Sequence, residues 1–170
     1  ADREDGMASI LNVVQASEGI GDFLAEMKRE TFEKYDAFTV GEVFHEKESE
    51  LGDFVGTDGY FSTMFDFGPE LIGKADVCYE YAEVTPKDYK ETIFASQKRM
   101  ESVGLLANII ENHDEMRGVS RYIPEGDLCD ASKKALAAVY FFLKGIPVIY
   151  QGQDIGMENC PFQDLSEIED

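Results

Sequence analysis

Three apolar segments of the chain end abruptly in side chains that can hold a ligand or transfer a proton. The segments and the polar residues that follow them are 38–41 before Glu42, 105–110 before 111–114, and 146–150 before 151–154. In (β/α) barrels the reactive residues lie at the carboxyl ends of the parallel strands. Strands that end in this way therefore predict an enzyme site for a saccharide or another small molecule.

Glu42, His113 and Asp114 have the residue types that glycosidic chemistry needs. A partly desolvated Glu42, placed after Gly41 where a ligand could approach closely, would have the raised pKa of a general acid. His113 and Asp114 together could grip vicinal hydroxyls, and the Asp114 charge could stabilise an oxocarbenium ion. A surface glutamate that ends a strand, and a His-Asp pair that stabilises a loop, are the alternatives that these motifs leave open.

Other side chains near these strand ends have two interpretations. Arg117 could hold a carboxylate by bidentate hydrogen bonding or could be a solvated loop charge, and Asn112 and Arg121 are ambiguous in the same way. Glu111 at the strand end could support its neighbours. Four aromatic residues are predicted to be core residues and not sugar-stacking platforms: Phe61, Phe65, Phe141 and Phe142.

The elements that must position these residues alternate between helix and strand. Apolar spacing predicts an amphipathic helix over 20–34, whose apolar face includes Ile20, Phe23 and Met27. A second helix is predicted to begin after a Thr85 cap and to stop at Gly104, and a third to run from an Asp130 cap to Gly145.

Strands are predicted at the three polar-ended segments and, with less punctuation, at 60–67, while 46–59 is predicted to be a loop or a short exposed helix. Each helix-length crossover favours parallel pairing of the strands that it joins. The fold class is therefore α/β, about half of a (β/α)8 barrel. A complete barrel needs about 250 residues, so the sheet edges should pair with missing strands or with another copy.

The chain has 170 residues, 44% of them hydrophobic and 12% aromatic, and a formal net charge of −20. This composition is typical of a folded globular domain. An acidic surface repels phosphate backbones and anionic lipids, so we expect no nucleic-acid or membrane partner, whereas a neutral sugar is unaffected by it. No Gly-rich phosphate loop follows a strand, which disfavours nucleotide chemistry.

The cysteines are odd in number and widely spaced: Cys78, Cys129 and Cys160. Neither a disulfide framework nor a zinc site is expected, and we expect no metal and no cofactor. Residues 1–5 do not have the pattern of a signal peptide, and no stretch has the roughly 18 apolar residues that span a bilayer. We therefore expect a cytoplasmic protein.

Three motifs in order, TVGEV (39–43), ENHDEMR (111–117) and GIPVIYQGQDIGM (145–157), resemble the α-amylase family of glycoside hydrolases, glycoside hydrolase family 13. Within it they are most similar to the oligo-1,6-glucosidase and α-glucosidase group. The resemblance implies that residues 1–170 are a single domain, the C-terminal half of a TIM barrel with strands 5 to 8. It implies that Glu42 is the general acid/base, that Asp114 stabilises the transition state, and that His113 and Arg117 bind substrate.

The sequence also departs from the pattern of this family. Members carry a nucleophilic Asp in a Gly-Phe-Arg-x-Asp type motif after the fourth strand, and no such segment precedes Glu42. Asp2 and Asp5 do not follow an apolar strand, so neither replaces it. Met116 stands where Pro is common, and Gln153-Asp154 replaces Glu-Glu, which are tolerable changes. We therefore expect a fragment that is catalytically silent alone.

Three hypotheses remain open from the sequence. The first is a fragment of a retaining α-glucosidase whose partners are α-linked glucose oligosaccharides and the rest of the parent barrel. The second is a transglycosylase or isomerase of the sucrose isomerase or trehalose synthase type, and the third is a non-catalytic sugar-binding half-barrel. The sequence does not separate α-1,4 from α-1,6 preference, and exposed barrel edges predict a homodimer.

Overall fold

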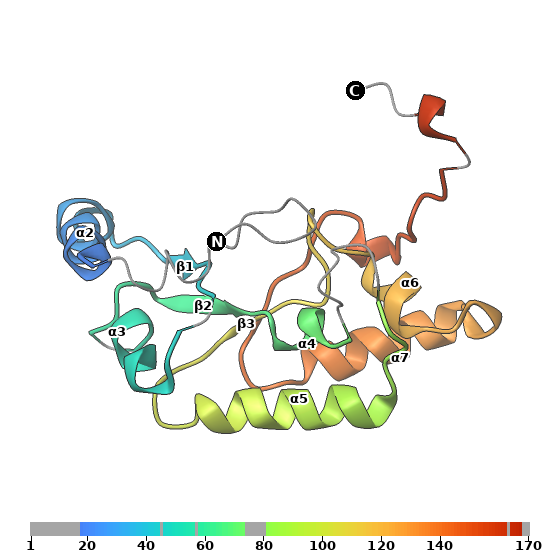
Figure 1. Ribbon diagram of the computed structural model, residues 1–170, viewed down its shortest axis with the longest axis horizontal. Helices are drawn as coiled ribbons and strands as arrows, with labels where there is room; N and C mark the ends of the chain where they lie inside the picture. Colours follow the sequence, from blue (N-terminus) through green and yellow to red (C-terminus); the bar gives the residue numbers. More distant parts are fainter. Residues whose placement is uncertain (1–17, 45, 57, 74–80, 163, 168–170) are drawn as a thin grey trace, which may run out of the picture. The chain divides into compact units, whose positions relative to one another are not determined.

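The computed structural model describes residues 18–44, 46–56, 58–73, 81–162 and 164–167 (Figure 1). The chain divides into two compact units, Ala1–Met64 and Phe65–Asp170. Cys78 and the N-terminal segment 1–5, on which predictions were made, lie outside the described residues. In the described part of the chain, no helix is both long and apolar enough to cross a membrane.

The predicted strands are all present as parallel strands. They are β1 (Val40–Gly41), β2 (Thr63–Asp66), β3 (Ala107–Asn108) and β4 (Ile146–Pro147), hydrogen-bonded in the order β1-β2-β3-β4. In the first unit β1 pairs with the first half of β2, and in the second unit the other half of β2 pairs with β3, which pairs with β4. The prediction of a parallel, barrel-like sheet is confirmed, although each strand is shorter than its apolar segment.

The helix predicted over 20–34 is present in the first unit as three consecutive pieces. It begins as α2 (Ile20–Met27), continues as a π-helix, η1 (Lys28–Phe32), and ends as a 3-10 turn, η2 (Glu33–Tyr35). Its apolar face is largely exposed, since Ile20 is 59% and Phe23 70% exposed. In the described part of the first unit, no element covers that face.

The acidic segment after β1 is more ordered than predicted. It forms η3 (Glu48–Glu50) and α3 (Leu51–Phe54). The helix is not exposed throughout, because Leu51 and the following Val55 are each only 1% exposed. Burial of Leu51 and Val55 is enough to bury one side of this short helix.

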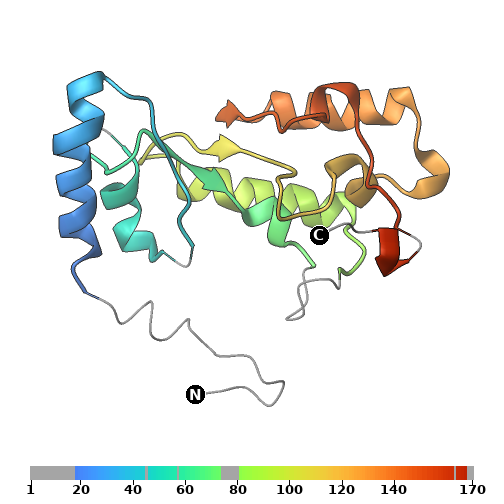
Figure 2. The ribbon, with the colours of Figure 1, turned by 90° about the horizontal axis from the view of Figure 1, so that it is seen from above.

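The second unit contains α4 (Gly68–Leu71), α5 (Pro86–Arg99), α6 (Gly118–Tyr122), η4 (Glu125–Asp127) and α7 (Asp130–Phe141), with η5 (Gln153–Ile155) and η6 (Leu165–Glu167) after β4. The helices α5 and α7 are the long ones in both views (Figures 1 and 2). Thr85 caps α5 as predicted, since its Oγ1 accepts from the N–H of Asp88 at 3.3 Å. The Thr85 hydroxyl and backbone N–H hold the pKa of Asp88 below its ordinary value.

Both long helices differ in detail from the prediction. The helix α5 ends at Arg99 and not at Gly104, and the residue that caps α7 is Cys129, with Asp130 in the first turn. Tyr140 of α7 is fully buried. Phe142 is 89% exposed, so its assignment to the core, like that of the 44%-exposed Phe141, is wrong. Successive helical residues point about 100° apart, so residues next to a buried one face elsewhere.

Hydrogen bonds from Tyr140 fix the relation between β3 and β4. Its hydroxyl lies within bonding distance of two main-chain oxygens, that of Asn108 at 2.6 Å and that of Val148. The backbone N–H of Val148 also donates to the Asn108 carbonyl at 3.0 Å. Burial raises the pKa of Tyr140, which therefore remains a neutral donor.

Gly145 occupies the turn that leads into β4. Its φ is +141°, and a Cβ at this position would lie 2.6 Å from Asn108 Nδ2 and 2.7 Å from the carbonyl oxygen of Leu106. Glycine is required here because of both the backbone conformation and the close approach of β3.

We predict that Gly145→Ala destabilises the fold by about 2 kcal/mol or more, because the added methyl group clashes with β3 in a conformation that side chains disfavour. Urea unfolding followed by circular dichroism measures the difference. Gly126→Ala is the matched control, because nothing lies within 4 Å of its Cβ position. Equal stability of the two variants would contradict the prediction.

Removal of a buried tyrosine hydroxyl should lower the stability of the fold at Tyr140 but not at Tyr89. Tyr140→Phe removes a bonded hydroxyl and should cost about 1 to 2 kcal/mol. Tyr89 of α5 has a buried hydroxyl with no hydrogen-bond partner in the described chain. Tyr89→Phe should therefore leave stability unchanged or increased.

Tyr89 should also make the stability of the fold depend on pH, which unfolding curves can measure. Burial, helped by the charge of Asp66, raises the pKa of Tyr89 from 10.0 to about 12. The stability linked to neutral Tyr89 is present in full below the ordinary pKa and is lost as the pH rises through the folded-state pKa. Tyr89→Phe should therefore lose less stability than the parent chain as the pH rises from 10.0 to about 12, and an identical loss would contradict this.

Candidate active site

Glu42 follows β1 directly in the first unit, and its side chain is exposed. Gly41 before it is buried, and a Cβ there would lie 2.5 Å from Cδ2 of Phe61. The room that was expected to admit a ligand is therefore filled by the Phe61 ring. The expected desolvation of Glu42 is also not supplied by the described residues around it.

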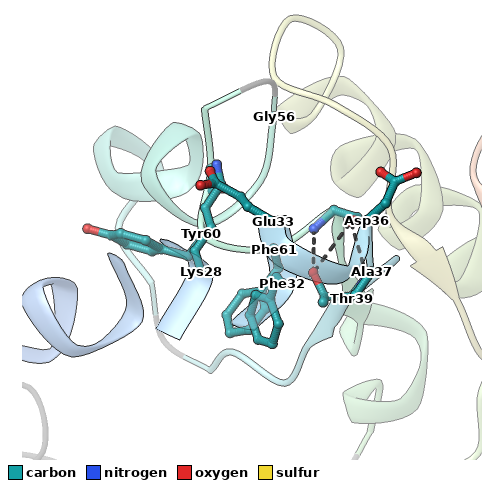
Figure 3. A pocket seen from close by; sticks show the side chains of 11 residues that line it. Lys28, Phe32, Glu33, Asp36, Ala37, Thr39, Gly56, Tyr60 and Phe61 are labelled. Carbon is teal, nitrogen blue, oxygen red and sulfur yellow. Dashed lines mark hydrogen bonds between the residues drawn. The ribbon is translucent and has the colours of Figure 1, made fainter. Parts of the chain in front are cut away.

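The first unit contains a cavity of about 190 Å³ that is lined by residues of η1, η2, and the segments before β1 and β2 (Figure 3). In it, Lys28 Nζ donates to the carbonyl oxygen of Gly59 at 2.8 Å. Thr39 precedes β1 and lines the cavity, whereas Glu42 follows β1 and does not. The cavity therefore lies at the opposite ends of the strands from the predicted site.

His113 and Asp114 lie together in the loop that follows β3 in the second unit. His113 Nε2 lies 3.4 Å from Asp114 Oδ2, and the two side chains are 72% and 67% exposed. The backbone N–H of Asp114 donates to Asn112 Oδ1 at 2.8 Å, which is a turn that aspartates and asparagines commonly form. The predicted pair is thus adjacent and open to a ligand.

Glu111 supports this loop from beneath. Its side chain is only 1% exposed, and its carboxylate accepts from Arg117 Nη1 at 2.9 Å and from the backbone N–H of Gly118 at 2.7 Å. Arg117 thus holds a carboxylate, as one interpretation of the sequence suggested, through one nitrogen and not two. A Cβ at position 118 would lie 2.9 Å from Ile110 Cδ1, so glycine permits this close approach.

Arg117 also joins the loop after β3 to the loop after β4. Its Nη1 donates to the carbonyl oxygen of Gln151 at 2.7 Å, and its guanidinium carbon lies 4.8 Å from the centre of the Tyr150 ring. Its backbone N–H donates to Asn159 Oδ1 at 2.8 Å. This link was missed from the sequence, because contacts between separate loops leave no periodic pattern.

A second set of contacts, also missed from the sequence, reaches the residue after Asp114. Tyr81 donates its hydroxyl to Glu115 Oε2 at 2.5 Å. The guanidinium of Arg121, ambiguous from the sequence, lies 4.4 Å from the centre of the Tyr81 ring and donates to the carbonyl oxygen of Ile72. The loop is therefore tied to the segment after β2 as well. Across the described ranges, no three His, Cys, Asp or Glu side chains could hold a metal ion.

Comparison with known proteins gives this arrangement a family. Residues 8–169 match the model of the alpha amylase catalytic domain. The chain belongs to the alpha-amylase family. It is 38% identical over 156 residues to probable oligo-1,6-glucosidase 3 of Bacillus subtilis strain 168, and the match covers 91% of this chain and 27% of that protein. It is 33% identical to the glucan 1,6-alpha-glucosidase of Streptococcus dysgalactiae subsp. equisimilis, covering 88% of this chain and 29% of that protein.

Solved structures of alpha-amylase family enzymes share the fold. The trehalose-6-phosphate hydrolase of Bacillus licheniformis superimposes with a TM-score of 0.78 at 32% identity, over 88% of this chain and 28% of that one. The trehalulose synthase of Pseudomonas mesoacidophila MX-45 gives 0.81 at 29% identity, over 93% of this chain and 29% of that one. The chain therefore spans less than a third of these relatives, and the prediction of a partial TIM barrel is confirmed.

We predict that Arg117→Ala destabilises the second unit by about 2 to 3 kcal/mol, because it leaves the buried Glu111 carboxylate without its cation. Thermal and urea unfolding measure the change. Lys133→Ala is the control, because its pair with Glu158 is partly exposed, with side-chain exposures of 22% and 53%, and should cost less than about 1 kcal/mol. Equal losses would show that burial of Glu111 does not matter.

Proposed function

We propose that this chain is part of a retaining α-glucosidase that hydrolyses α-glucosidic bonds in short oligosaccharides. The observation that carries the proposal is that Glu42 follows β1 and Asp114 lies in the loop after β3, in a chain 38% identical to a probable oligo-1,6-glucosidase. We further propose that the two units belong to one catalytic barrel. Two relatives, 38% and 33% identical, support an α-1,6 preference, as their names are those of 1,6-glucosidases.

In this proposal Glu42 protonates the leaving glycosidic oxygen, and its exposed position leaves it accessible to a substrate. A carboxylate from another part of the barrel attacks the anomeric carbon, because the chain contains no motif for that nucleophile. Glu42 then acts as a base and removes a proton from the water that hydrolyses the glycosyl-enzyme.

The loop after β3 would bind the sugar ring and stabilise its developing charge. Asp114 has an exposed carboxylate that could face an oxocarbenium ion, and His113 beside it could hydrogen-bond the ring hydroxyls. The prediction that Arg117 binds substrate stays a prediction. Its contacts with Glu111 and Gln151 favour a role in holding the loop.

A transglycosylase or isomerase of the same family is the second candidate. The similarity to a trehalulose synthase, with a TM-score of 0.81, supports it. A related structure of that enzyme, in complex with the substrate sucrose, matches with a TM-score of 0.82. Product analysis on sucrose, maltose and isomaltose separates the candidates, since only an isomerase converts sucrose into another disaccharide.

We predict that the chain alone releases no p-nitrophenol from p-nitrophenyl α-glucoside, because it lacks a nucleophile. A chimera in which this chain replaces the matched segment of the Bacillus subtilis relative should be active. Glu42→Gln in the chimera should lower kcat by about 10³-fold, since an amide cannot donate the proton.

Glu48→Gln is the control for this test, because Glu48 is an exposed glutamate a few residues further along the chain. It should leave kcat unchanged. Turnover by the chain alone that vanished with Glu42→Gln would mean that the nucleophile has been misplaced. A folded but inactive chimera that still bound glucose would favour a non-catalytic sugar-binding module.

A further inference from the structure

We infer that the buried Glu111 is a positioning residue that sets the orientation of Asp114 and couples it, through Arg117, to the loop after β4. For its catalytic consequence this inference rests on the proposed function. Glu111 cannot contact a sugar itself, because its side chain is only 1% exposed. Any effect on the reaction must therefore pass through the residues that it holds.

The Glu111 carboxylate closes the loop after β3. Glu111 lies in the loop after β3, and its two oxygens accept from Arg117 Nη1 and from the backbone N–H of Gly118 further along the same loop. Residues 112–116 therefore form a short loop, closed where Glu111 at its start binds Arg117 and Gly118 at its end. Asp114 is at the middle of that loop, so the base of the loop determines where its carboxylate points.

The tip of this loop is exposed, whereas the ion pair that closes it is buried. The Asp114 and His113 side chains are 67% and 72% exposed, so packing does not hold them. The Glu111 pair lies beneath them, with side-chain exposures of 1% for Glu111 and 19% for Arg117, where water competes poorly. Order in the exposed residues therefore comes from the buried base, from the Asn112 turn and from the hydrogen bond between Tyr81 and Glu115.

Arg117 couples the loop after β3 to the loop after β4. Arg117 Nη1, which binds Glu111, also donates to the carbonyl oxygen of Gln151 at 2.7 Å. The Arg117 guanidinium stacks on Tyr150 at 4.8 Å from the ring centre. One cation therefore sets the loop after β3 relative to the loop after β4.

Glu111→Gln tests the inference with the least change in shape. Arg117 and Gly118 donate to different oxygens of Glu111. A glutamine replaces one of these oxygens with an N–H₂ group, which cannot accept, so one of the two contacts is lost. In the chimera we expect kcat to fall by about 10²-fold, with KM changed less than about threefold, because a misplaced group slows the reaction more than it weakens binding.

Glu158→Gln is the matched control, because Glu158 also pairs with a cation, Lys133, in the same unit but outside this loop. It should leave kcat unchanged. In Arg117→Ala, millimolar guanidinium chloride should restore part of the lost kcat, while sodium chloride should not, since only guanidinium replaces the missing group. A merely structural role for the pair predicts no such rescue. An unchanged kcat in Glu111→Gln, or a rise in KM alone, would overturn the inference.

Hydrogen exchange on the chain alone separates this inference from the proposed function. In Glu111→Gln, the amides of Asp114 and Gly118 should lose protection while those of α5 keep theirs. That loss would support the positioning role even if the chimera proved inactive and the proposed function failed. Unchanged protection of both amides would overturn the positioning role whatever the activity.

Discussion

Buried polar groups fix the position of β3 and β4 together with the short strand ladders, and a buried hydrogen bond joins β2 to α5. The strands β3 and β4 share two residue pairs in register. Tyr140 spans them from α7 through the main-chain oxygens of Asn108 and Val148, and Asp66 at the end of β2 accepts from Ser96 of α5 at 2.7 Å. A slip of one residue would leave these buried groups unpaired, which costs more than a lost exposed bond. The loop that carries Asp114 therefore leaves the sheet at one defined point.

The same physical rule extends past the end of β3. Glu111 is a buried charge, and a buried charge is tolerated only when it is paired and hydrogen-bonded. Its two partners close the loop, and Arg117 then reaches the loop after β4. The exposed pair of His113 and Asp114 thus lies in a loop that a buried ion pair closes.

The sequence was sufficient for the order, type and direction of the main elements, because apolar periodicity and the Thr85 and Gly145 signals are local. It also identified the residues at the strand ends. It failed where the answer depends on what lies opposite a side chain. The exposed Phe142, the filled space beside Gly41 and the link from Arg117 to Gln151 are all set by tertiary neighbours. The buried Leu51 was missed because the charged residues around it dominate the composition of its segment.

The close contact between Gly41 and Phe61 limits which residues can replace either of them. The Phe61 ring occupies the volume that any side chain at position 41 would need, with Cδ2 only 2.5 Å from the site of a Cβ. A larger residue at 41 is therefore admissible only after Phe61 has become smaller, and a smaller residue at 61 alone leaves a void. Neither single step is neutral, so the two positions should evolve as an epistatic pair. Replacement of Gly41, the residue before Glu42, would then require a less stable intermediate sequence.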